Sequence, residues 1–363
     1  MSRKFFDTLT KKMLVVMTIS LLVIIVGCEK SSSNKNANKS TNEEYSYAVI
    51  SSTMTKDKSI ISLYDENGKF IKDKKIKYGG IVLSDFKIES ESNGNNVFYV
   101  GSAIIPHANH YMLKINKDTL DATTLDTSIC PTFFTIDNKY SYAGSAYVDG
   151  TKLEKIEIDT NKIINSYKPE VEGGSSLNEK DNKLYLVSSG YEDDKLKMYL
   201  TTLNKENLKI EKKISLGGGE RTQSTKMIGD YIWVTKPYDE DGNNLNELLK
   251  VSIKDFSIKV LKLPFCNMYQ TLKSNDYIYI TEYNMHGEET KNQIARLNAK
   301  NDNVECFKLE NNLEMAQIDE NKKELLATDG EKMYVYNLND FTLKRSFELK
   351  QYDDLVFASF FIK

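Results

Sequence analysis

Apolar and polar residues alternate in short runs along most of this chain, and the runs return at a nearly constant interval. Each of these first runs alternates bulky residues, as a β-strand does. Successive runs begin 50, 43, 44, 47, 46 and 47 residues apart. A period in this range is typical of a repeat architecture. The runs are YAVISS from Tyr47, VFYVGS from Val97, YSYAGS from Tyr140, LYLVSS from Leu184, YIWVTK from Tyr231, YIYITE from Tyr277 and ELLATD from Glu324.

Two further runs follow each first run. The second run closes with an apolar residue ahead of a polar one, usually Asn or Asp, which suits a tight turn because these side chains bond their own backbone. The third run alternates with period two, as a half-buried strand does. The second runs close at Ile115-Asn116, Ile158-Asp159, Leu203-Asn204, Leu297-Asn298 and Leu338-Asn339. Hairpin-forming pairs lie at Asn67-Gly68, Asn93-Gly94, Asp149-Gly150, Asp241-Gly242 and Asp329-Gly330.

Four antiparallel strands in about 46 residues describe one blade of a β-propeller. We name the strands a to d from the central axis outward, so that each first run is a strand b. The first repeat has no strand a, whereas the chain ends in an unpartnered apolar strand from Leu355 to Ile362. Supplying this strand to the N-terminal repeat predicts an all-β, seven-bladed propeller closed by its two ends. Closure pairs strand edges that would otherwise be exposed.

The strand pattern of residues 45–362 resembles that of the seven-bladed YVTN and quinoprotein-amine-dehydrogenase-like propellers. The YVTN tetrapeptide is echoed in Tyr99-Val100-Gly101-Ser102 and in Trp233-Val234-Thr235-Lys236. Trp233 is the single tryptophan, so the Trp-docking repeats of quinoprotein dehydrogenases and the Asp-box turns of sialidase-like propellers are missing. Those two enzyme families are therefore disfavoured. A pair of β-sandwiches and a ring of six or eight blades are the alternatives to seven blades.

The first 27 residues have a different character. Four basic residues precede an uncharged apolar run from residue 13 to residue 26, as in an export signal. The run is shorter than the roughly 20 residues that a spanning helix needs. It ends in Ile25-Val26-Gly27-Cys28, which resembles the lipobox of a bacterial lipoprotein. The resemblance implies cleavage before Cys28 and a diacylglyceryl thioether on its sulfur. An uncleaved anchor and an ordinary secretory signal are the alternatives.

Residues 29–44 contain one Ala and no larger apolar residue, which predicts a flexible tether. We therefore divide the chain into a signal peptide (1–27), a tether from lipidated Cys28 (28–44) and a propeller domain (45–363). The frequent Asn, Lys and Glu are consistent with a low-GC Gram-positive bacterium. The expected location is outside the cytoplasmic membrane, and the expected anchor is the lipid on Cys28.

The charge balance bears on the partners. The whole chain has 49 Lys and Arg against 52 Asp and Glu, and without the four basic residues and one acidic residue of the leader the balance is 45 to 51, a net of −6. This balance argues against nucleic acid as a partner. It also argues against non-specific attachment to an anionic membrane, and it leaves a local basic patch open.

Catalytic motifs are absent from the sequence. The three histidines, His107, His110 and His286, form no HExxH motif, and no GxSxG, Walker or GxGxxG motif occurs. Gly217-Gly218-Gly219 has no helix after it and is interpreted as a loop between blades. We accordingly assign no catalytic, metal-binding or cofactor-binding residue.

Two further features have structural interpretations. The acidic stretch from Asp239 to Glu247 lacks the glycine spacing of an EF-hand loop and predicts a hairpin turn, with weak calcium binding as the alternative. Cys130, Cys266 and Cys306 are interpreted as thiols that pack as small apolar residues. A Cys266–Cys306 disulfide is the alternative for two of them.

Four tyrosines at equivalent places suggest a ligand-binding face. Each lies six or seven residues after the start of its strand b, opens a b–c connection and is followed by acidic residues. Equivalent positions of successive blades lie on one rim, where aromatic rings and charges can receive a sugar, a peptide or a cationic group. The alternative is that they only terminate strands. The tyrosines are Tyr147, Tyr191, Tyr238 and Tyr283.

Three glutamines repeat at the same interval on the predicted a strands. Gln223, Gln270 and Gln317 are spaced by 47 residues, so they are expected near the axis, where they line a central channel. The alternative is a water-bridged structural ring, because a buried amide needs hydrogen-bond partners.

The favoured function is a binding module, tethered to the membrane outside the cytoplasm, for a protein, peptide or glycan. It depends on the leader, the tether, the ring pattern and the lack of a nucleophile–base set. The alternative is a propeller enzyme, lyase-like or lactonase-like, with its active site at the mouth of the central channel. A transporter's solute-binding lipoprotein ranks third, because such proteins have helical stripes that this chain lacks.

Overall fold

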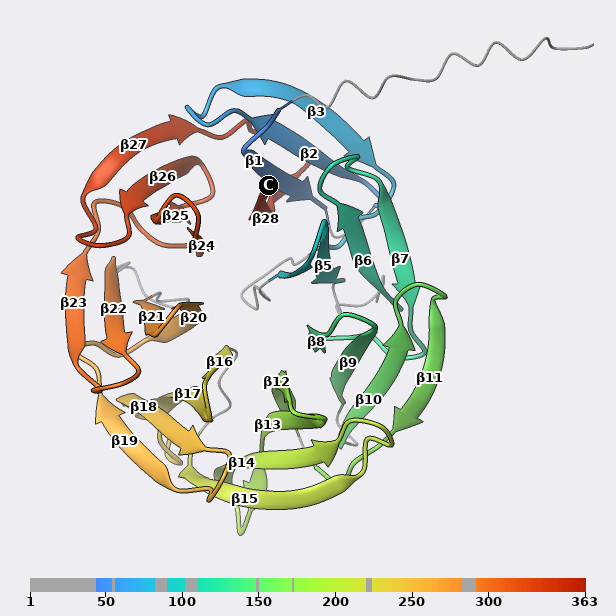
Figure 1. Cartoon of the computed structure of the whole chain (residues 1–363), viewed down its shortest axis with the longest axis vertical. Helices are drawn as coiled ribbons and strands as arrows, with labels where there is room; N and C mark the ends of the chain where they lie inside the picture. Colours follow the sequence, from blue (N-terminus) through green and yellow to red (C-terminus); the bar gives the residue numbers. More distant parts are fainter. Residues whose placement is uncertain are drawn as a thin grey trace, which may run out of the picture. The chain divides into compact units, whose positions relative to one another are not determined.

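The computed structural model is a ring of β-sheets (Figure 1). It describes residues 44–53, 56–81, 90–101, 110–147, 150–171, 173–219, 224–282 and 292–363. Within these residues, the strands form seven four-stranded sheets, and no helix occurs. Every strand pair is antiparallel. The seven-bladed prediction is confirmed, and the alternatives of six blades, eight blades or two sandwiches are wrong.

Each sheet is one blade, whose strands run from a at the axis to d at the rim. Blade 1 consists of β28 (Val356–Ile362), β1 (Tyr47–Ser52), β2 (Ser59–Tyr64) and β3 (Phe70–Ile76). Blade 2 consists of β4 (Glu91–Asn93), β5 (Asn96–Val100), β6 (Tyr111–Asn116) and β7 (Ala122–Asp126). Blade 3 consists of β8 (Phe133–Ile136), β9 (Tyr140–Tyr147), β10 (Gly150–Glu157) and β11 (Lys162–Tyr167). Blade 4 consists of β12 (Gly174–Lys180), β13 (Lys183–Glu192), β14 (Lys195–Asn204) and β15 (Ile210–Gly218).

The remaining three blades have the same order. Blade 5 consists of β16 (Thr225–Ile228), β17 (Tyr231–Tyr238), β18 (Asn244–Ser252) and β19 (Ile258–Lys262). Blade 6 consists of β20 (Met268–Ser274), β21 (Tyr277–Glu282), β22 (Gln293–Asn298) and β23 (Val304–Lys308). Blade 7 consists of β24 (Met315–Asp319), β25 (Glu324–Thr328), β26 (Lys332–Asn337) and β27 (Leu343–Glu348). All seven predicted first runs are therefore strands b.

The last strand closes the ring. β28 pairs antiparallel with β1, with Phe360 opposite Val49 and Phe357 opposite Ser51. Phe360 and Phe361 are buried, and burying one such side chain is worth about 1.5–3 kcal/mol. The predicted closure by the C-terminal strand is confirmed, and a short apolar tail thus becomes the inner strand of the first blade.

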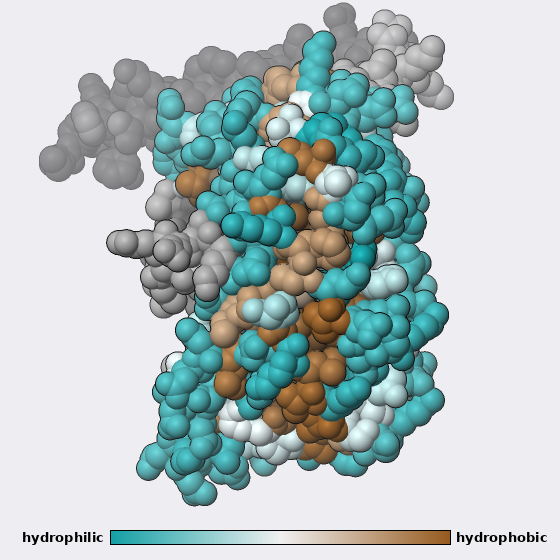
Figure 2. All heavy atoms as spheres, turned by 90° about the vertical axis from the view of Figure 1, so that its left-hand side faces the viewer, coloured by the Kyte–Doolittle hydropathy of each residue, from teal (hydrophilic) through white to brown (hydrophobic). Residues whose placement is uncertain are grey.

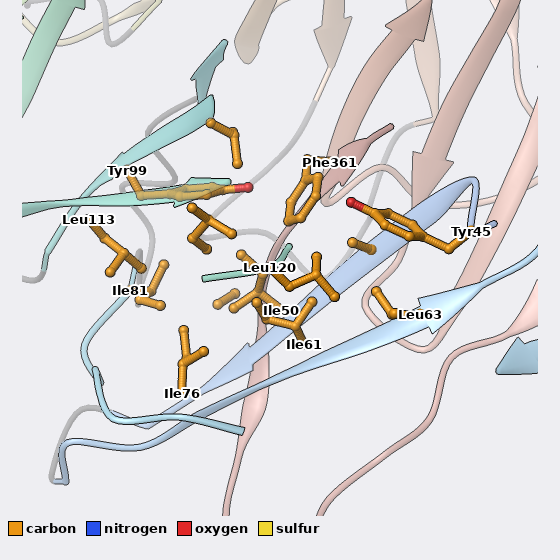
Figure 3. Close-up of a cluster of buried hydrophobic side chains, with 14 residues drawn as sticks. Tyr45, Ile50, Ile61, Leu63, Ile76, Ile81, Tyr99, Leu113, Leu120 and Phe361 are labelled. Atoms are coloured by element: carbon orange, nitrogen blue, oxygen red, sulfur yellow. The ribbon is translucent and has the colours of Figure 1, made fainter. Parts of the chain in front are cut away.

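The core lies between neighbouring blades. Figure 3 shows the cluster between blades 1 and 2, where Ile50 and Phe361 of blade 1 meet Tyr99 of blade 2. The ring of Tyr45 contacts the ring of Phe361 edge-on, with centroids 6.4 Å apart. The Tyr45 hydroxyl donates a hydrogen bond to the carbonyl oxygen of Lys117 in blade 2. The first aromatic residue after the tether therefore fastens two blades together.

The outer strands are half-buried, as their alternation predicts. Along β27, half-buried and exposed residues alternate without interruption. Figure 2 shows the flank of the ring that carries β19, β23 and β27, where apolar side chains form a stripe among hydrophilic ones. On β19, Ile258 and Val260 are exposed.

One face of the ring carries the a–b and c–d turns, and we call it the turn face. Its c–d turns contain four or five residues in all seven blades. In blade 4, the Asn204 side chain accepts bonds from the amides of Glu206 and Asn207, and the Leu208 amide donates to the Asn204 carbonyl. Three of the five predicted turns begin as expected. In blades 3 and 7, strand c ends earlier than predicted, so the turns follow Glu157 and Asn337 and not Asp159 and Asn339.

A large apolar residue ends several of these turns in the left-handed backbone region. Leu120, Leu208 and Phe341 have φ of 58°, 61° and 55°, although left-handed backbone is unfavourable for such residues. All three side chains are buried. Burial between blades offsets the conformational cost, so the turns are part of the core.

A cation from one blade holds the c–d turn of the next blade. Lys250 donates to the Ala299 carbonyl at 3.0 Å and pairs with Asp302 at 2.6 Å, and both partners lie in the turn of blade 6. Lys155 reaches Glu206 of blade 4 at 3.2 Å. Arg296 reaches the Asn339 carbonyl of blade 7. These contacts link neighbouring blades on the turn face.

Four of the predicted Asn-Gly and Asp-Gly turns are also confirmed, whereas Asp149 of the fifth lies outside the described residues. All five glycines have positive φ. At Gly68 the φ is 82°, and a Cβ atom there would lie 2.1 Å from the ring of Phe347, so both backbone and packing require glycine.

Cys130, Cys266 and Cys306 carry free thiols, so the alternative Cys266–Cys306 disulfide is not formed. Across the part of the chain that the structure describes, no helix is long and apolar enough to cross a membrane. The leader and the tether lie outside the described residues.

Candidate functional site

The face opposite the turn face carries the b–c and d–a connections, and we call it the loop face. Its b–c connections range from two residues, between β13 and β14, to ten residues, between β21 and β22. Loops of variable length on a rigid scaffold are the usual place for binding residues. The loop face is therefore where a ligand site is expected.

A groove on the loop face lies between blades 3 and 4. The d–a connection after β11 supplies residues 168–171, and the b–c hairpin of blade 4 supplies residues 190–192. Tyr199 of β14 and Lys213 of β15 complete the lining, together with Gly150. The groove has a volume of about 730 Å³, within the range of small-molecule sites. We refer to it as the Tyr191 groove.

The blade 4 hairpin fixes the position of Tyr191. Glu192 and Lys195 are paired across a two-residue turn, Asp193-Asp194, whose φ values are 52° and 60°. Positive φ at both positions is the signature of a type I′ turn, which sets the register of the two strands. Tyr191 lies one residue before the end of β13, and 71% of its surface is exposed. The predicted ligand residue thus lines a groove and is open to solvent.

The neighbouring side chains hold the groove wall in place. The Tyr199 hydroxyl donates to a Glu192 carboxylate oxygen at 3.0 Å. The Lys213 ammonium lies 4.0 Å from the centroid of the Tyr199 ring, a cation–π contact. Lys168 and Glu170 come from the connection that follows blade 3. The groove therefore offers one exposed aromatic ring among acidic and basic groups.

Two of the other predicted tyrosines lie at strand ends. Tyr147 is the last residue of β9 and Tyr238 the last residue of β17. Tyr238 is half-buried. Tyr283 lies outside the described residues, and so does the side chain of Tyr147. Among the described side chains of this set, Tyr191 is the one that the structure brings into a groove.

The acidic stretch after Tyr238 forms the predicted hairpin turn. The Asp239 carboxylate accepts hydrogen bonds from the amides of Asp241 and Asn243 and from the Asn243 side chain. These bonds, the one from the Asn243 side chain above all, lower the pKa of Asp239. Glu240 pairs with Lys195 of blade 4 at 2.6 Å. Among the described residues, no group of three or more His, Cys, Asp or Glu side chains is arranged to hold a metal ion.

The inner strands enclose a central cavity of about 510 Å³. Gln270 lines it, and its side-chain oxygen accepts a bond from the Ala316 amide at 2.7 Å. The Gln317 side chain donates to the Phe360 carbonyl at 2.5 Å. Each amide thus links its own blade to the next one. Both glutamines also line the cavity, and Gln223 lies outside the described residues.

Other polar side chains on the cavity wall also join neighbouring blades. The Thr271 amide of blade 6 donates to the Ser224 hydroxyl, just before blade 5, at 2.9 Å. Asn178 of blade 4 donates to the Thr225 hydroxyl of blade 5 at 2.6 Å. Glu91 of blade 2 accepts a bond from the Ile136 amide of blade 3 at 2.9 Å. The wall is therefore a belt of hydrogen bonds between blades.

A thiol and an imidazole meet elsewhere on the loop face. The Cys130 sulfur lies 3.5 Å from Nε2 of His110 and 3.9 Å from its Nδ1. The sequence did not predict this pair, because the residues lie 20 positions apart in separate connections and match no motif. His107 lies outside the described residues.

Comparison with known proteins shows the fold alone. No protein-family model matches the sequence, and no curated protein matches it. A functionally unknown protein from Desulfotomaculum acetoxidans is similar in structure, with a TM-score of 0.58, 8% identity, and coverage of 84% of this chain and 95% of that one. Apo AztD from Citrobacter koseri has a TM-score of 0.54, 13% identity, and coverage of 84% and 82%. The computationally designed protein Ika8 has a TM-score of 0.51, 12% identity, and coverage of 87% and 95%.

Proposed function

We propose that this protein is a lipid-anchored binding module outside the cytoplasmic membrane, and that it captures a glycan in the Tyr191 groove. The observation that carries the ligand proposal is the exposed ring of Tyr191 inside a groove lined by charged side chains. An exposed aromatic face is a large, rigid surface for stacking. The leader and the lipobox-like sequence at Cys28 support the anchor.

The mixed charge of the groove favours a glycan over a charged ligand. Glu170 and Glu192 supply acceptors, and Lys168 and Lys213 supply donors. A sugar carries hydroxyl groups that both donate and accept, so it satisfies both kinds of side chain. A strongly cationic peptide would gain from the carboxylates and lose at the ammonium groups. A neutral oligosaccharide is therefore the favoured ligand.

The tether suits a module of this kind. Sixteen residues, 29–44, separate Cys28 from the domain, and they span at most about 55 Å when fully extended. We propose that this segment, whose composition predicts flexibility, lets the domain turn relative to its anchor. Rotation about the tether then lets the groove face a ligand outside the membrane, wherever on the domain surface the groove lies.

A binding measurement tests the ligand proposal. The mature protein in detergent is applied to a panel of immobilised neutral oligosaccharides, with an oligolysine peptide for comparison. We expect Tyr191→Ala to weaken oligosaccharide binding at least about tenfold, as loss of an aromatic anchor does. Tyr238→Ala, at the equivalent place in blade 5, is the control and should bind like the wild type. Binding to oligolysine and to no oligosaccharide would overturn the glycan proposal.

Fractionation tests the anchor. Cys28→Ala removes the sulfur that would carry the lipid, so the protein should leave the membrane fraction and appear in the medium. Retention of the variant in the membrane fraction would reject lipidation of Cys28 as the anchor.

The propeller enzyme remains the alternative, with its site at the channel mouth. The charged groups described there have structural partners: Glu91 holds the Ile136 amide, and Glu179 pairs with Lys205 of blade 4. We therefore favour the binding module.

A further inference from the structure

We propose that Cys130 and His110 form a reactive-thiol site on the loop face, where small-molecule disulfides modify Cys130. The proposal depends on the contact between the Cys130 sulfur and the imidazole of His110, 3.5 Å at the closest nitrogen. It is independent of the ligand proposed for the Tyr191 groove. It concerns a thiol that the sequence interpretation treated only as a packing residue.

The backbone around the pair fixes their separation. His110 immediately precedes β6, and its carbonyl accepts a bond from the Thr127 amide at 3.0 Å. Thr127 lies in the connection between β7 and β8, and Cys130 lies three residues after Thr127 in that connection. Ser128 of that connection is in turn held by Glu154, through a bond from the Ser128 amide at 3.0 Å and a second bond from its hydroxyl. The pair is therefore positioned by β6 and β7 of blade 2 and, through Glu154, by β10 of blade 3.

The position of the pair allows a reagent to approach. His110 is exposed and Cys130 is half-buried. A thiol becomes nucleophilic as the thiolate, and an adjacent imidazolium stabilises that form. Glu154, the carboxylate that contacts the same connection, is buried and engaged by Ser128. The imidazole is thus in direct contact with the sulfur.

Cys306 provides the opposite environment in the same molecule. Burial raises the pKa of the Cys306 thiol, and the nearby Glu282 carboxylate raises it further. The Cys306 sulfur contacts the side-chain oxygen of Gln293 at 3.5 Å, which is an acceptor. A thiol beside an imidazole and a thiol beside a carboxylate therefore form a natural pair for comparison.

The reaction is a thiol–disulfide exchange. His110 takes the proton of the Cys130 thiol, and the sulfur attacks one sulfur of a small disulfide, R–S–S–R. A new bond forms between Cys130 and S–R, the S–S bond of the reagent breaks, and the departing thiolate takes the proton as R–SH. The disulfide reagent supplies the oxidation, so no other oxidant is needed.

Residue-resolved kinetics test the site. The mature protein reacts with 5,5′-dithiobis(2-nitrobenzoate) at pH 6, and mass spectrometry follows each cysteine. We expect Cys130 to react about tenfold faster than Cys306, because the imidazole beside the Cys130 sulfur favours its thiolate, whereas the Glu282 carboxylate disfavours the thiolate of Cys306. His110→Gln should slow Cys130 to the rate of Cys306 and move the midpoint of its pH–rate profile upward, while Cys306 keeps its own rate.

Two results would overturn the proposal. One is a Cys130 rate no greater than that of Cys306 in the wild type. The other is a Cys130 rate and pH profile that stay unchanged in His110→Gln. An unchanged circular dichroism spectrum and an unchanged Cys306 rate show that the variant is folded.

Discussion

The two faces of the ring differ in regularity. On the turn face, every c–d turn has four or five residues, and cations such as Lys250 join each of several turns to the preceding blade. On the loop face, the b–c connections vary from two to ten residues, and the Tyr191 groove opens between two blades. The comparison teaches that the regular face stabilises the ring, whereas the irregular face is free to differ from blade to blade and to carry specificity.

Ring closure should give the largest effect, because both faces depend on it. Deleting residues 354–363 removes β28, exposes the edge of β1 and opens the buried cluster around Phe361. We expect the cooperative unfolding transition to be lost in differential scanning calorimetry. Val356→Ser is the matched control, because Val356 belongs to β28 but is 58% exposed. A truncated protein with unchanged melting would contradict closure by β28.

The second effect concerns the contacts between blades on the turn face. Lys250→Met leaves the half-buried Asp302 carboxylate without its closer partner and should lower the free energy of unfolding by about 2–3 kcal/mol. Lys259→Met is the matched control, since Lys259 pairs with the same carboxylate but is 61% exposed. It should cost less than about 0.5 kcal/mol. If urea unfolding gave the same loss of unfolding free energy for Lys250→Met and Lys259→Met, the contact between blades made by Lys250 would add no more stability than an exposed ion pair.

The same pair predicts a pH dependence. Burial raises the pKa of Asp302, but the bonds from Lys250 and Lys259 outweigh it, so the folded pKa lies below the ordinary value. A lowered folded pKa gives stability that is present above the unfolded pKa of about 3.9 and is lost as the pH falls through the folded pKa. The stability difference between wild type and Lys250→Met should therefore be constant near pH 7 and shrink below about pH 4. A difference that stays constant down to pH 3 would contradict this.

The smallest effect is expected on the loop face. Lys195 and Glu240 join the b–c hairpins of blades 4 and 5, but Lys195 is exposed and Glu240 is only half-buried at the surface. Solvent screens such pairs, so Lys195→Ala should leave the melting temperature unchanged. A clear drop would mean that the loop face also stabilises the ring and would weaken the contrast between the faces.

Local chemistry explains why the fold was predictable from the sequence. Strands such as β17 show alternation, and turns such as Asn67-Gly68 contain the residues that their backbone requires. The b strands and the closing strand were accordingly predicted at the right positions. The turn of blade 7 shows the limit of local reasoning. Asn337 and Asn339 are both good caps, and only the register of β26 decides between them.

The sites were harder to predict, because they form between segments that are distant in the sequence. The tyrosine repeat pointed to Tyr191, but the groove also needs Lys168 and Glu170 from the preceding blade. The contact between Cys130 and His110 depends on how two connections pack. Gln270 and Gln317 line the central cavity as their spacing predicted, and their bonds to the backbone of the next blade could not be read from that spacing. Sequence spacing gives the position of a residue along a blade and leaves its partner across the blade interface open.

The central claim is that the turn face stabilises the ring and the loop face binds the ligand. Two variants measured together test it most directly. Tyr191→Ala and Lys250→Met are each assayed for oligosaccharide binding at about 20 °C, well below the melting range of ordinary domains, and for melting temperature. The account predicts that Tyr191→Ala loses binding and keeps the wild-type melting temperature, while Lys250→Met melts at a lower temperature and keeps wild-type affinity. If each variant changed both properties together, the separation of a stabilising face from a binding face would be contradicted.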